Sequence, residues 1–440
     1  MREVKAVAVD TDDVNAYNLV TMMTFEKQTL AFLHDCALDK NRLLAASEQA
    51  ALQAIHGLLK QADEVVICLG GKAGRLGECV VGTALLEGTL QALRYMGKVG
   101  LPVHIFVDEG VIPLFDMQLY EDTYWSNINI FALNVSVNVS VDVRQCAIQV
   151  VGSGNVVVLD FHGANDGMPY LQFVEDLSGA QVEQDAHAHV AILGQLFRVG
   201  IRSYADRGPE RRYADFIETL FGLPVDALDG KQVQPRILVT DEGDKRYYQL
   251  AQTFGLNLEC PFIVCFFQSV VLAKCYERWD EVLQLLCEQL ALHMPGQKID
   301  IVLLCGSDAD LPQGMRKADM EEWLGNFQGV GANARVLICS TPALRDLAIL
   351  TSHAVLVLSN DTGPGHIAGA LGIPTVTPFL PGNIYSKKVW SSTLSHWGIT
   401  LDSNPYSLPA LEAAVTWGKT DIINRIEPLH LCNAAWRYLH

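Results

Sequence analysis

Basic residues are scarce in this sequence. Its 440 residues include 32 lysines and arginines against 50 aspartates and glutamates, which gives a formal net charge of -18. Proteins that bind nucleic acids or anionic membranes usually present a basic surface. We therefore expect neither of these partners, although the overall charge still allows a local basic pocket that holds a diphosphate.

Long hydrophobic runs are missing as well. Hydrophobic residues make up 50% of the chain, but no stretch approaches the roughly 18 uninterrupted apolar residues that a membrane-spanning helix needs. The first residues also lack the apolar core of a signal peptide. The sequence thus predicts a cytoplasmic protein with no transmembrane segment.

The eleven cysteines are scattered, and no two of them form a C-x-x-C pair. Such pairs are typical of zinc and redox sites. Cys68 and Cys339 lie in apolar segments, where a free thiol behaves as a small hydrophobic group. Cys260, Cys265 and Cys275 form a loose cluster, which leaves a metal site open as the less favoured interpretation. The favoured one is a reduced protein without a metal.

Predicted strands and helices alternate along most of the chain, which is also too long for one ordinary core. One series begins at the apolar strand Val65–Leu69 and a second at Phe262–Phe267, with a polar stretch between them. The pattern predicts an α/β fold with two Rossmann-like, doubly wound domains facing a cleft. The predicted parts are an N-terminal extension (1–63), a first domain (64–245), a second domain (246–415) and a C-terminal helix (416–440).

Three predicted helices lie in the less regular parts of the chain. One covers Leu43–Gln61 in the extension, to which we assign no chemistry, and one covers Thr420–Tyr438, which could cross back onto the first domain. The third spans His187–Phe197. Residues two apart do not share a helix face, so His187 and His189 are not expected to form a metal pair.

The most informative segment is 359–379, SNDTGPGHIAGALGIPTVTPF. An apolar strand, Ala354–Leu358, ends there in Asn360 and Asp361, a glycine turn follows, and a helix of small residues runs over His366–Leu371. A strand, a glycine turn and a helix present backbone N–H groups to a phosphate. The alternative is a tight turn that only packs, with Asp361 as a helix cap.

The order Asp-Thr-Gly-Pro-x-His-x-Ala-x-Ala-x-Gly-x-Pro in this segment closely resembles the donor-site motif of the ADP-heptose glycosyltransferase family. That family, glycosyltransferase family 9, comprises the lipopolysaccharide heptosyltransferases and their relatives. The resemblance implies a GT-B fold and a reaction that needs no metal. It also implies that the donor is held by Thr362, Gly363, Pro364, Gly365, His366 and Asp361, of which Asp361 would either bind the donor sugar or fix the loop.

A second segment, Arg75 to Arg94, is similar to the first N-terminal motif of the same family, which begins Arg-Leu-Gly-Asp. The family's aspartate is regarded as the general base that activates the acceptor hydroxyl, and Glu78 stands at that position here. Both side chains are carboxylates, and the base must lie within hydrogen-bond reach of the proton that it removes. The alternative for Glu78 is an acid that the dipole of a helix N-terminus stabilises. The glycine-rich loop before it is not a Walker A motif.

A third segment resembles the family more weakly. In the family, a Ser or Thr and then a Lys follow the first strand of the second domain and contact the donor diphosphate. Ser269 and Lys274 are the corresponding candidates here, and Lys274 would stabilise the departing diphosphate. Lys274 stands five residues before Trp279, further than usual, so Arg278 is a rival. A solvated surface cation is the alternative for either residue.

Asp160 and His162 follow a predicted strand of the first domain and are the candidates for the acceptor side. A lone histidine after a strand is more often structural.

The resemblance implies an inverting glycosyltransferase that moves a sugar from a nucleotide diphosphate donor to an acceptor hydroxyl. ADP-heptose is the favoured donor, and no cofactor is required. Two alternatives stay open: another GT-B sugar-nucleotide enzyme, such as an epimerase or hydrolase, and a non-catalytic sugar-nucleotide-binding partner. The sequence does not identify the acceptor, which could be a glycan, a protein or a small molecule, and it does not reveal the oligomeric state.

Overall fold

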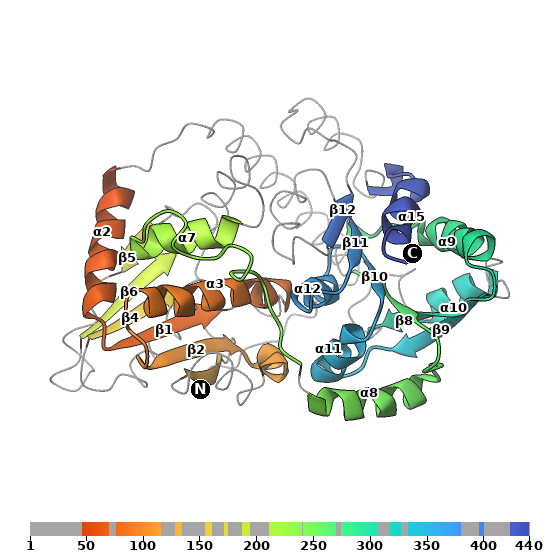
Figure 1. The fold of residues 1–440 in the computed structure, drawn as a ribbon, viewed down its shortest axis with the longest axis horizontal. Coiled ribbons are helices and arrows are strands. Elements are labelled where there is room, and N and C mark those ends of the chain that lie inside the picture. Colours follow the sequence, from red (N-terminus) through yellow and green to blue (C-terminus); the bar gives the residue numbers. More distant parts are fainter. Residues whose placement is uncertain are drawn as a thin grey trace, which may run out of the picture.

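The chain builds two six-stranded sheets, one in each half of the molecule (Figure 1). The computed structural model of the protein describes residues 46–69, 76–115, 128–133, 155–160, 171–174, 187–193, 211–239, 241–269, 274–306, 317–326, 333–379, 396–399 and 423–439. We call the described residues up to 236 the N-terminal half and those from 237 onward the C-terminal half.

The sheet of the N-terminal half has the strand order β3-β2-β1-β4-β6-β5. Its strands are β1 (Glu64–Leu69), β2 (Val103–Asp108), β3 (Ile128–Leu133), β4 (Asn155–Asp160), β5 (Leu171–Val174) and β6 (His187–Leu193). Neighbouring strands pair in parallel, except that β5 runs antiparallel to β6. β1 is central, with Val65 opposite both Val103 and Val157. Its continuous apolar run is typical of a parallel strand covered on both faces.

The helix predicted over His187–Phe197 is wrong, because this segment contains strand β6. β6 pairs with β4 along its whole length and closes the sheet toward β5. A short apolar run between polar residues fits a strand as well as part of a helix, and here the pairing with β4 decides. The argument that helical spacing separates His187 from His189 therefore does not apply.

The helices of the N-terminal half cover its sheet. They are α2 (Ala46–Gln61), α3 (Leu76–Tyr95), the 3-10 helix η2 (Glu109–Leu114) and α7 (Arg212–Phe221). The helix predicted over Leu43–Gln61 corresponds to α2, which packs against α7, β4 and β5. Ile55 and Leu59 of α2 are completely buried in this core. A boundary at residue 63 therefore cuts α2 off from the core to which it contributes, and α2 is not part of an extension.

The sheet of the C-terminal half has the order β12-β11-β10-β7-β8-β9, with all strand pairs parallel. Its strands are β7 (Phe262–Phe266), β8 (Ile299–Cys305), β9 (Ala334–Ser340), β10 (Leu356–Ser359), β11 (Thr375–Pro378) and β12 (His396–Ile399). Read from β9, this is the Rossmann strand order, in which the direction of winding reverses between the first and fourth strands. Here those two strands are β7 and β10.

The C-terminal half carries helices on both faces of its sheet (Figure 1). They are α8 (Asp241–Phe254), α9 (Trp279–His293), α10 (Lys317–Asn326), α11 (Leu344–Ser352), α12 (Gly363–Ala370), η7 (Ile423–Arg425) and α15 (Pro428–Trp436). The alternating residues of β7 show the two faces. Phe262, Val264 and Phe266 belong to one hydrophobic cluster, and Ile263 and Cys265 belong to another.

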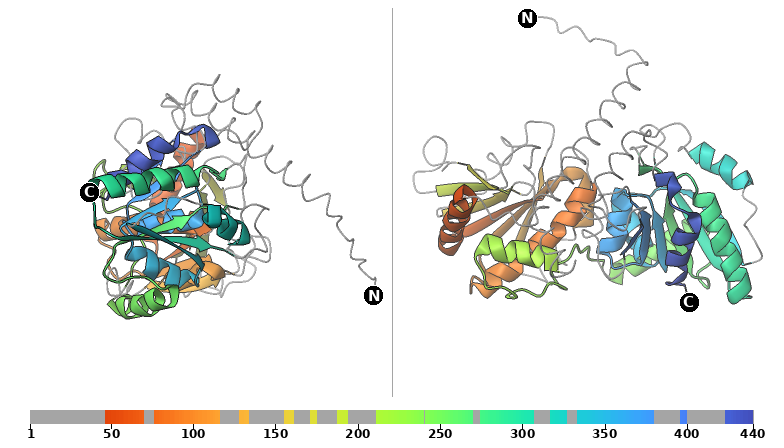
Figure 2. Two further views of the ribbon diagram at one scale, coloured as in Figure 1. Left: turned by 90° about the vertical axis from the view of Figure 1, so that its right-hand side faces the viewer. Right: turned by 90° about the horizontal axis from the view of Figure 1, so that it is seen from above.

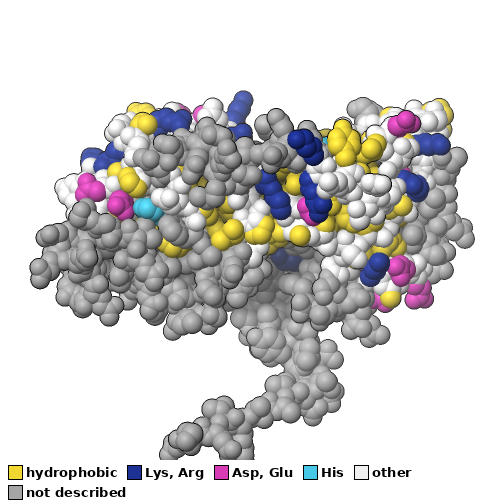
Figure 3. All heavy atoms as spheres, turned by 90° about the horizontal axis from the view of Figure 1, so that it is seen from below, with side chains coloured by type: hydrophobic (Ala, Val, Ile, Leu, Met, Phe, Trp, Pro, Cys, Tyr) yellow, Lys and Arg dark blue, Asp and Glu magenta, His cyan; other side chains and the backbone are white. Residues whose placement is uncertain are grey.

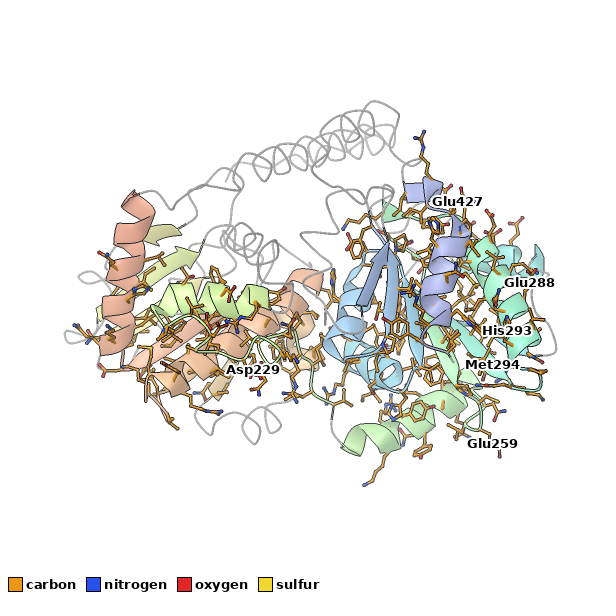
Figure 4. All side chains as sticks on the ribbon, turned by 45° about the horizontal axis from the view of Figure 1, so that its top comes forward. Asp229, Glu259, Glu288, His293, Met294 and Glu427 are labelled. Carbon is orange, nitrogen blue, oxygen red and sulfur yellow. The ribbon has the colours of Figure 1, made fainter. Side chains whose placement is uncertain are left out.

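The C-terminal helix does not cross back onto the N-terminal half. α15 packs along α9 and against β11, and its residues Leu431 and Cys432 join the hydrophobic cluster of that face. Figure 4 shows this arrangement, with Glu427 at the start of α15 and Glu288 and His293 on the neighbouring α9. The ring of His293 lies 5.7 Å from that of Trp436. An apolar helix needs an apolar partner surface, and here α9 supplies it.

One hydrophobic cluster runs through both halves. It includes Ile67 of β1 and Leu86 of α3 in the N-terminal half, and Val264 of β7 and Ile367 of α12 in the C-terminal half. α3 and α12 meet where the halves join, as the view from above shows (Figure 2). The two sheets are thus held on a shared core around these two helices.

Within the described ranges, every helix is too short or too polar to span a lipid bilayer. The cytoplasmic location stays a prediction.

Candidate active site

The predicted donor loop lies where the winding of the C-terminal sheet reverses. β7 and β10 are neighbours, with Leu358 opposite Cys265 and Ser359 opposite Phe266. The chain leaves β7 toward Ser269 and leaves β10 toward Asn360. In doubly wound sheets, ligands bind in the crevice at the carboxyl ends of such a strand pair. The fold therefore brings the third sequence segment, around Ser269 and Lys274, to the donor loop.

Asn360 ties these two segments together. It is fully buried, and its Oδ1 accepts hydrogen bonds from the backbone N–H of Tyr276 (3.2 Å) and from Nε1 of Trp279 (3.0 Å). Its Nδ2 donates to the carbonyl oxygen of Phe267 (2.6 Å). Phe267 also stacks on Trp279, with ring centroids 4.5 Å apart. Sequence reasoning missed this role because the partners of Asn360 lie 81 to 93 residues away in the chain.

Lys274 and Asp361 form a buried ion pair at the start of the loop. Nζ of Lys274 lies 2.9 Å from Oδ2 of Asp361, and it also donates to the Asp361 carbonyl oxygen at 3.4 Å. On the other side of this carboxylate, Nε2 of His366 lies 3.5 Å from Oδ1. Asp361 thus holds a lysine and a histidine at the loop. This arrangement favours the loop-fixing role of Asp361 over direct contact with the donor sugar.

Arg278, the rival of Lys274, points to a different part of the molecule. Its guanidinium bonds Glu281 (Nε to Oε1, 2.7 Å) and the carbonyl oxygen of Asn424 (3.3 Å). The hydrogen bond to Glu281 raises the pKa of Arg278 further above its usual value. Arg278 therefore secures the start of α9 beside η7, which leaves Lys274 as the cation at the loop.

The cysteines near this site behave as buried thiols. The Sγ of Cys275 donates to the carbonyl oxygen of Ser269 (3.5 Å), and burial raises the pKa of Cys275 to about 11. Burial also raises the pKa of Cys265. Both thiols are thus protonated near neutral pH. Among the residues that the structure describes, no three His, Cys, Asp or Glu side chains are placed to hold a metal ion.

The N-terminus of α12 forms the floor of the site. Thr362 is the N-cap residue in an extended conformation, and its side chain makes no capping hydrogen bond to the first turn. Gly365 is required by a close approach, because a Cβ there would lie 2.7 Å from Oγ of Ser359. That hydroxyl in turn donates to the carbonyl oxygen of Asn360 (2.6 Å). Uncapped N–H groups and the helix dipole are suited to an anionic group such as a phosphate.

The N-termini of α3 and α12 meet at this floor. A Cβ on Gly77 would lie 2.7 Å from Cδ2 of His366, and a Cβ on Gly363 would lie 2.9 Å from Cδ2 of Leu76. Each helix therefore uses a glycine to admit a side chain of the other. Glu78 follows Gly77 directly in the first turn of α3, so the backbone of the candidate base is placed beside the donor loop.

The contact at Gly77 leads to a test with a matched control. Gly77→Ala should destabilise the protein by about 1–3 kcal/mol, because the new methyl group overpacks the buried His366 ring. Gly57 lies in the middle of α2 and has no atom within 4 Å of an added Cβ. Gly57→Ala should therefore stabilise by about 0.5–1 kcal/mol through helix propensity. Urea unfolding measures both, and equal effects of the two substitutions would refute the close contact.

The structure describes only part of the residues that are candidates for the acceptor side. Asp160 is the last residue of β4, next to β1 in the sheet, so its backbone lies at the edge where α3 begins. The side chains of Asp160 and Glu78 lie outside the described part of the structure, as does His162. Their roles stay predictions.

Comparison with known proteins gives a family and a fold. The model of glycosyltransferase family 9 (heptosyltransferase) matches residues 195–405. The glycosyl transferase family 9 structure from Veillonella parvula DSM 2008 has a TM-score of 0.53 at 16% identity, covering 86% of this chain and 97% of that one. The ADP-heptose lps heptosyltransferase II of E. coli has a TM-score of 0.47 at 16% identity, covering 86% and 98%. A search of curated protein sequences gives no match.

The two findings differ in what they cover. At its low identity, the Veillonella structure shows the shared fold alone, which is the GT-B arrangement predicted from the sequence. The family model includes Lys274 and the donor loop but not the segment 75–94 with Glu78.

Proposed function

We propose that this chain, a glycosyltransferase of family 9 whose family domain spans residues 195–405, moves a sugar from a nucleoside diphosphate donor to an acceptor hydroxyl. The favoured donor is ADP-heptose. The transfer proceeds with inversion at the anomeric carbon, and it requires no metal. The acceptor is a glycan, a protein or a small molecule.

One observation carries this proposal: the first turns of α3 and α12 pack directly against each other. The contact between Gly77 and His366 joins the segment of the candidate base to the donor loop. In an inverting transfer the acceptor oxygen attacks the anomeric carbon opposite the leaving diphosphate, and the base removes the proton of that oxygen, so the segments that carry the base and bind the diphosphate must lie close together. Gly77 and His366 are 289 residues apart in the sequence, and only the fold brings them together.

Each group at the site has a part in the proposed reaction. The uncapped first turn of α12 binds the diphosphate through backbone N–H groups, as helix N-termini do for anions. Lys274 lies against the same loop and stabilises the charge that develops on the leaving diphosphate. Glu78 removes the proton of the acceptor hydroxyl as it attacks the anomeric carbon. The bond to the diphosphate breaks while the new glycosidic bond forms, and the nucleoside diphosphate leaves.

A thermal-shift panel with ADP, UDP, GDP, dTDP and CDP tests the donor site. ADP should stabilise the protein most, by about 2.7 kcal/mol when its concentration is a hundredfold above Kd. A larger shift with another nucleotide would correct the donor base and keep the transferase. The absence of a shift with all five at millimolar concentration would refute the donor site.

Product analysis separates the transferase from other enzymes that use sugar nucleotides. Without an acceptor, ADP-heptose should be turned over slowly, because only water can attack. Fast conversion to free sugar or to an isomeric sugar nucleotide would identify a hydrolase or an epimerase instead.

A further inference from the structure

Lys274 is an unusual cation, because the fold keeps it inside the protein. In the view from below, lysine and arginine side chains stand out on the surface of the described parts (Figure 3), whereas Lys274 is 9% exposed. Taking an ammonium group out of water is unfavourable unless a carboxylate and hydrogen-bond acceptors meet it in good geometry. Asp361 supplies both, through its Oδ2 and its carbonyl oxygen. The chain segments of these two residues must therefore be held in register.

Asn360 is the residue that fixes this register. It precedes Asp361 directly, and its Oδ1 accepts the backbone N–H of Tyr276, two residues after Lys274 in the chain. The next residue of the loop, Asp361, then contacts Lys274 itself. The backbone N–H of Asn360 donates to the carbonyl oxygen of Phe266 (2.9 Å), so β7 sets the position of the whole residue. Two adjacent loop residues thus hold two nearby points of one segment.

The three partners of the Asn360 side chain have fixed roles in hydrogen bonding. The backbone N–H of Tyr276 and the indole N–H of Trp279 only donate, and the carbonyl oxygen of Phe267 only accepts. A primary amide carries an acceptor and a donor on one planar group, so it satisfies all three partners at once. An ionised aspartate would place an acceptor against the carbonyl oxygen of Phe267. The site therefore specifies an asparagine.

The same amide closes the base of the loop that carries Ser269 and Lys274. This loop begins after Phe267 and ends before Trp279, and the rings of these two residues stack on each other. The amide of Asn360 bonds the carbonyl oxygen of the first and the indole of the second. Loss of these bonds would release the loop at both ends and move Lys274 away from its place.

We propose that Asn360 is a positioning residue of the donor site: its side-chain amide places Lys274 against Asp361 and so offers the ammonium group to the leaving diphosphate. Asn360 is itself completely buried, so it acts through Lys274 and not by contact with the donor. The part that concerns the diphosphate rests on the proposed function, whereas the placing of Lys274 does not. A group that must be held in place before the donor binds loses affinity when its support is removed.

Asn360→Asp tests the amide with the smallest change of shape. The protonated carboxyl can donate to the carbonyl oxygen of Phe267 as the amide does, whereas the ionised one cannot. Burial favours the protonated form, so the pKa of the new carboxyl rises. By calorimetry, the variant should bind ADP at least about tenfold more weakly than the wild type at about pH 8 and within about threefold of it at about pH 5.5.

The comparison with the wild type at each pH accounts for the other ionisable groups around the amide, which are Lys274, Tyr276, Asp361 and His366. Affinity equal to that of the wild type at the higher pH would overturn the proposal. A loss that stays unchanged at the lower pH would overturn it too, because a donor to Phe267 would then not matter.

The matched control is Asn257→Asp. Asn257 is exposed in the turn before β7, where its Oδ1 accepts the backbone N–H of Glu259 (3.1 Å). This turn precedes β7, whereas the donor loop follows the parallel strand β10, so the two lie at opposite edges of the sheet. The control makes the same chemical change and should bind ADP as the wild type does at both pH values.

A double-mutant cycle tests the placing of Lys274 without any ligand. Lys274→Met removes the ammonium that lies 2.9 Å from the buried carboxylate of Asp361 and should lower the urea midpoint strongly. In an Asn360→Ala background it should lower the midpoint much less, because the pair is already loosened. Circular dichroism follows the unfolding. In an Asn257→Ala background the shifts should add.

Additive shifts of Asn360→Ala and Lys274→Met would overturn the proposal, since Asn360 would then only stabilise the core. The cycle also keeps this inference separate from the proposed function. If the wild type bound none of the nucleotides, the donor site would fail, whereas the urea midpoints would still decide whether Asn360 places Lys274.

Discussion

Glu78→Gln should lower the rate of sugar transfer by about 10²- to 10⁴-fold while ADP binding stays close to that of the wild type. Glutamine keeps the size of the side chain but cannot accept the proton of the acceptor hydroxyl. The position in the first turn of α3 makes the substitution mild for folding, because losing a negative charge there costs about 0.3–1 kcal/mol. The loss should therefore appear in kcat and not in the stability of the protein.

The matched control for this experiment is Glu288→Gln. Glu288 is exposed on α9, where Oε1 accepts a hydrogen bond from Nε2 of Gln284 (2.7 Å), and it is remote from the donor loop (Figure 4). This variant makes the same chemical change and should transfer sugar at the wild-type rate. If Glu78→Gln retained full activity, Glu78 would be only an acid at a helix N-terminus. The base would then have to be sought elsewhere, with Asp160 the next candidate.

Removing one partner of the Lys274–Asp361 pair should have the largest effect on stability. Asp361→Asn removes the carboxylate that lies 2.9 Å from the buried ammonium of Lys274, and breaking a buried pair in this way costs about 3–5 kcal/mol. The double variant Lys274→Met, Asp361→Asn removes both charges and should recover most of that loss. Urea unfolding followed by tryptophan fluorescence measures the change, since Trp279 lies at this site.

The same variants separate stability from donor binding. The double variant should be folded and yet bind ADP weakly, because it lacks the cation that we propose for the diphosphate. Lys274→Met alone should also lose ADP affinity. If Lys274→Met bound ADP as the wild type does, the lysine would serve only to neutralise Asp361, and the diphosphate would depend on the N-terminus of α12 alone.

The sequence predicted the regular parts of the fold well, and physical reasons explain this. Parallel strands buried on both faces appear as short, continuous apolar runs, and β1 and β7 match the predicted strands Val65–Leu69 and Phe262–Phe267 to within one residue. The family resemblance carried by the donor loop is confirmed by the family model. The strand β6 was missed because His-Ala-His followed by an apolar run has no clear period. The places of α2 and α15 depend on partner surfaces that an amphipathic pattern does not specify.

The site was predicted less completely than the fold. Motifs predicted which loops would bind the donor, but not which side chains contact one another. The pairing of Lys274 with Asp361 spans 87 residues, and the hydrogen bond of Trp279 to Asn360 spans 81. Such contacts arise from the pairing of β7 with β10, which no local pattern encodes.

The glycines at the contact of α3 with α12 also limit how one half of the protein could be exchanged for that of a relative. In a protein of two similar halves, a recombinant that takes one half from a distant relative would be joined most naturally between residues 236 and 237. Yet Gly77 admits the ring of His366, and Gly363 admits the side chain of Leu76. A transplanted half with a larger residue at either glycine position would not seat against its new neighbour. An exchanged half should therefore fit only if it keeps glycine at its own position of this contact, or if the facing side chain is changed with it.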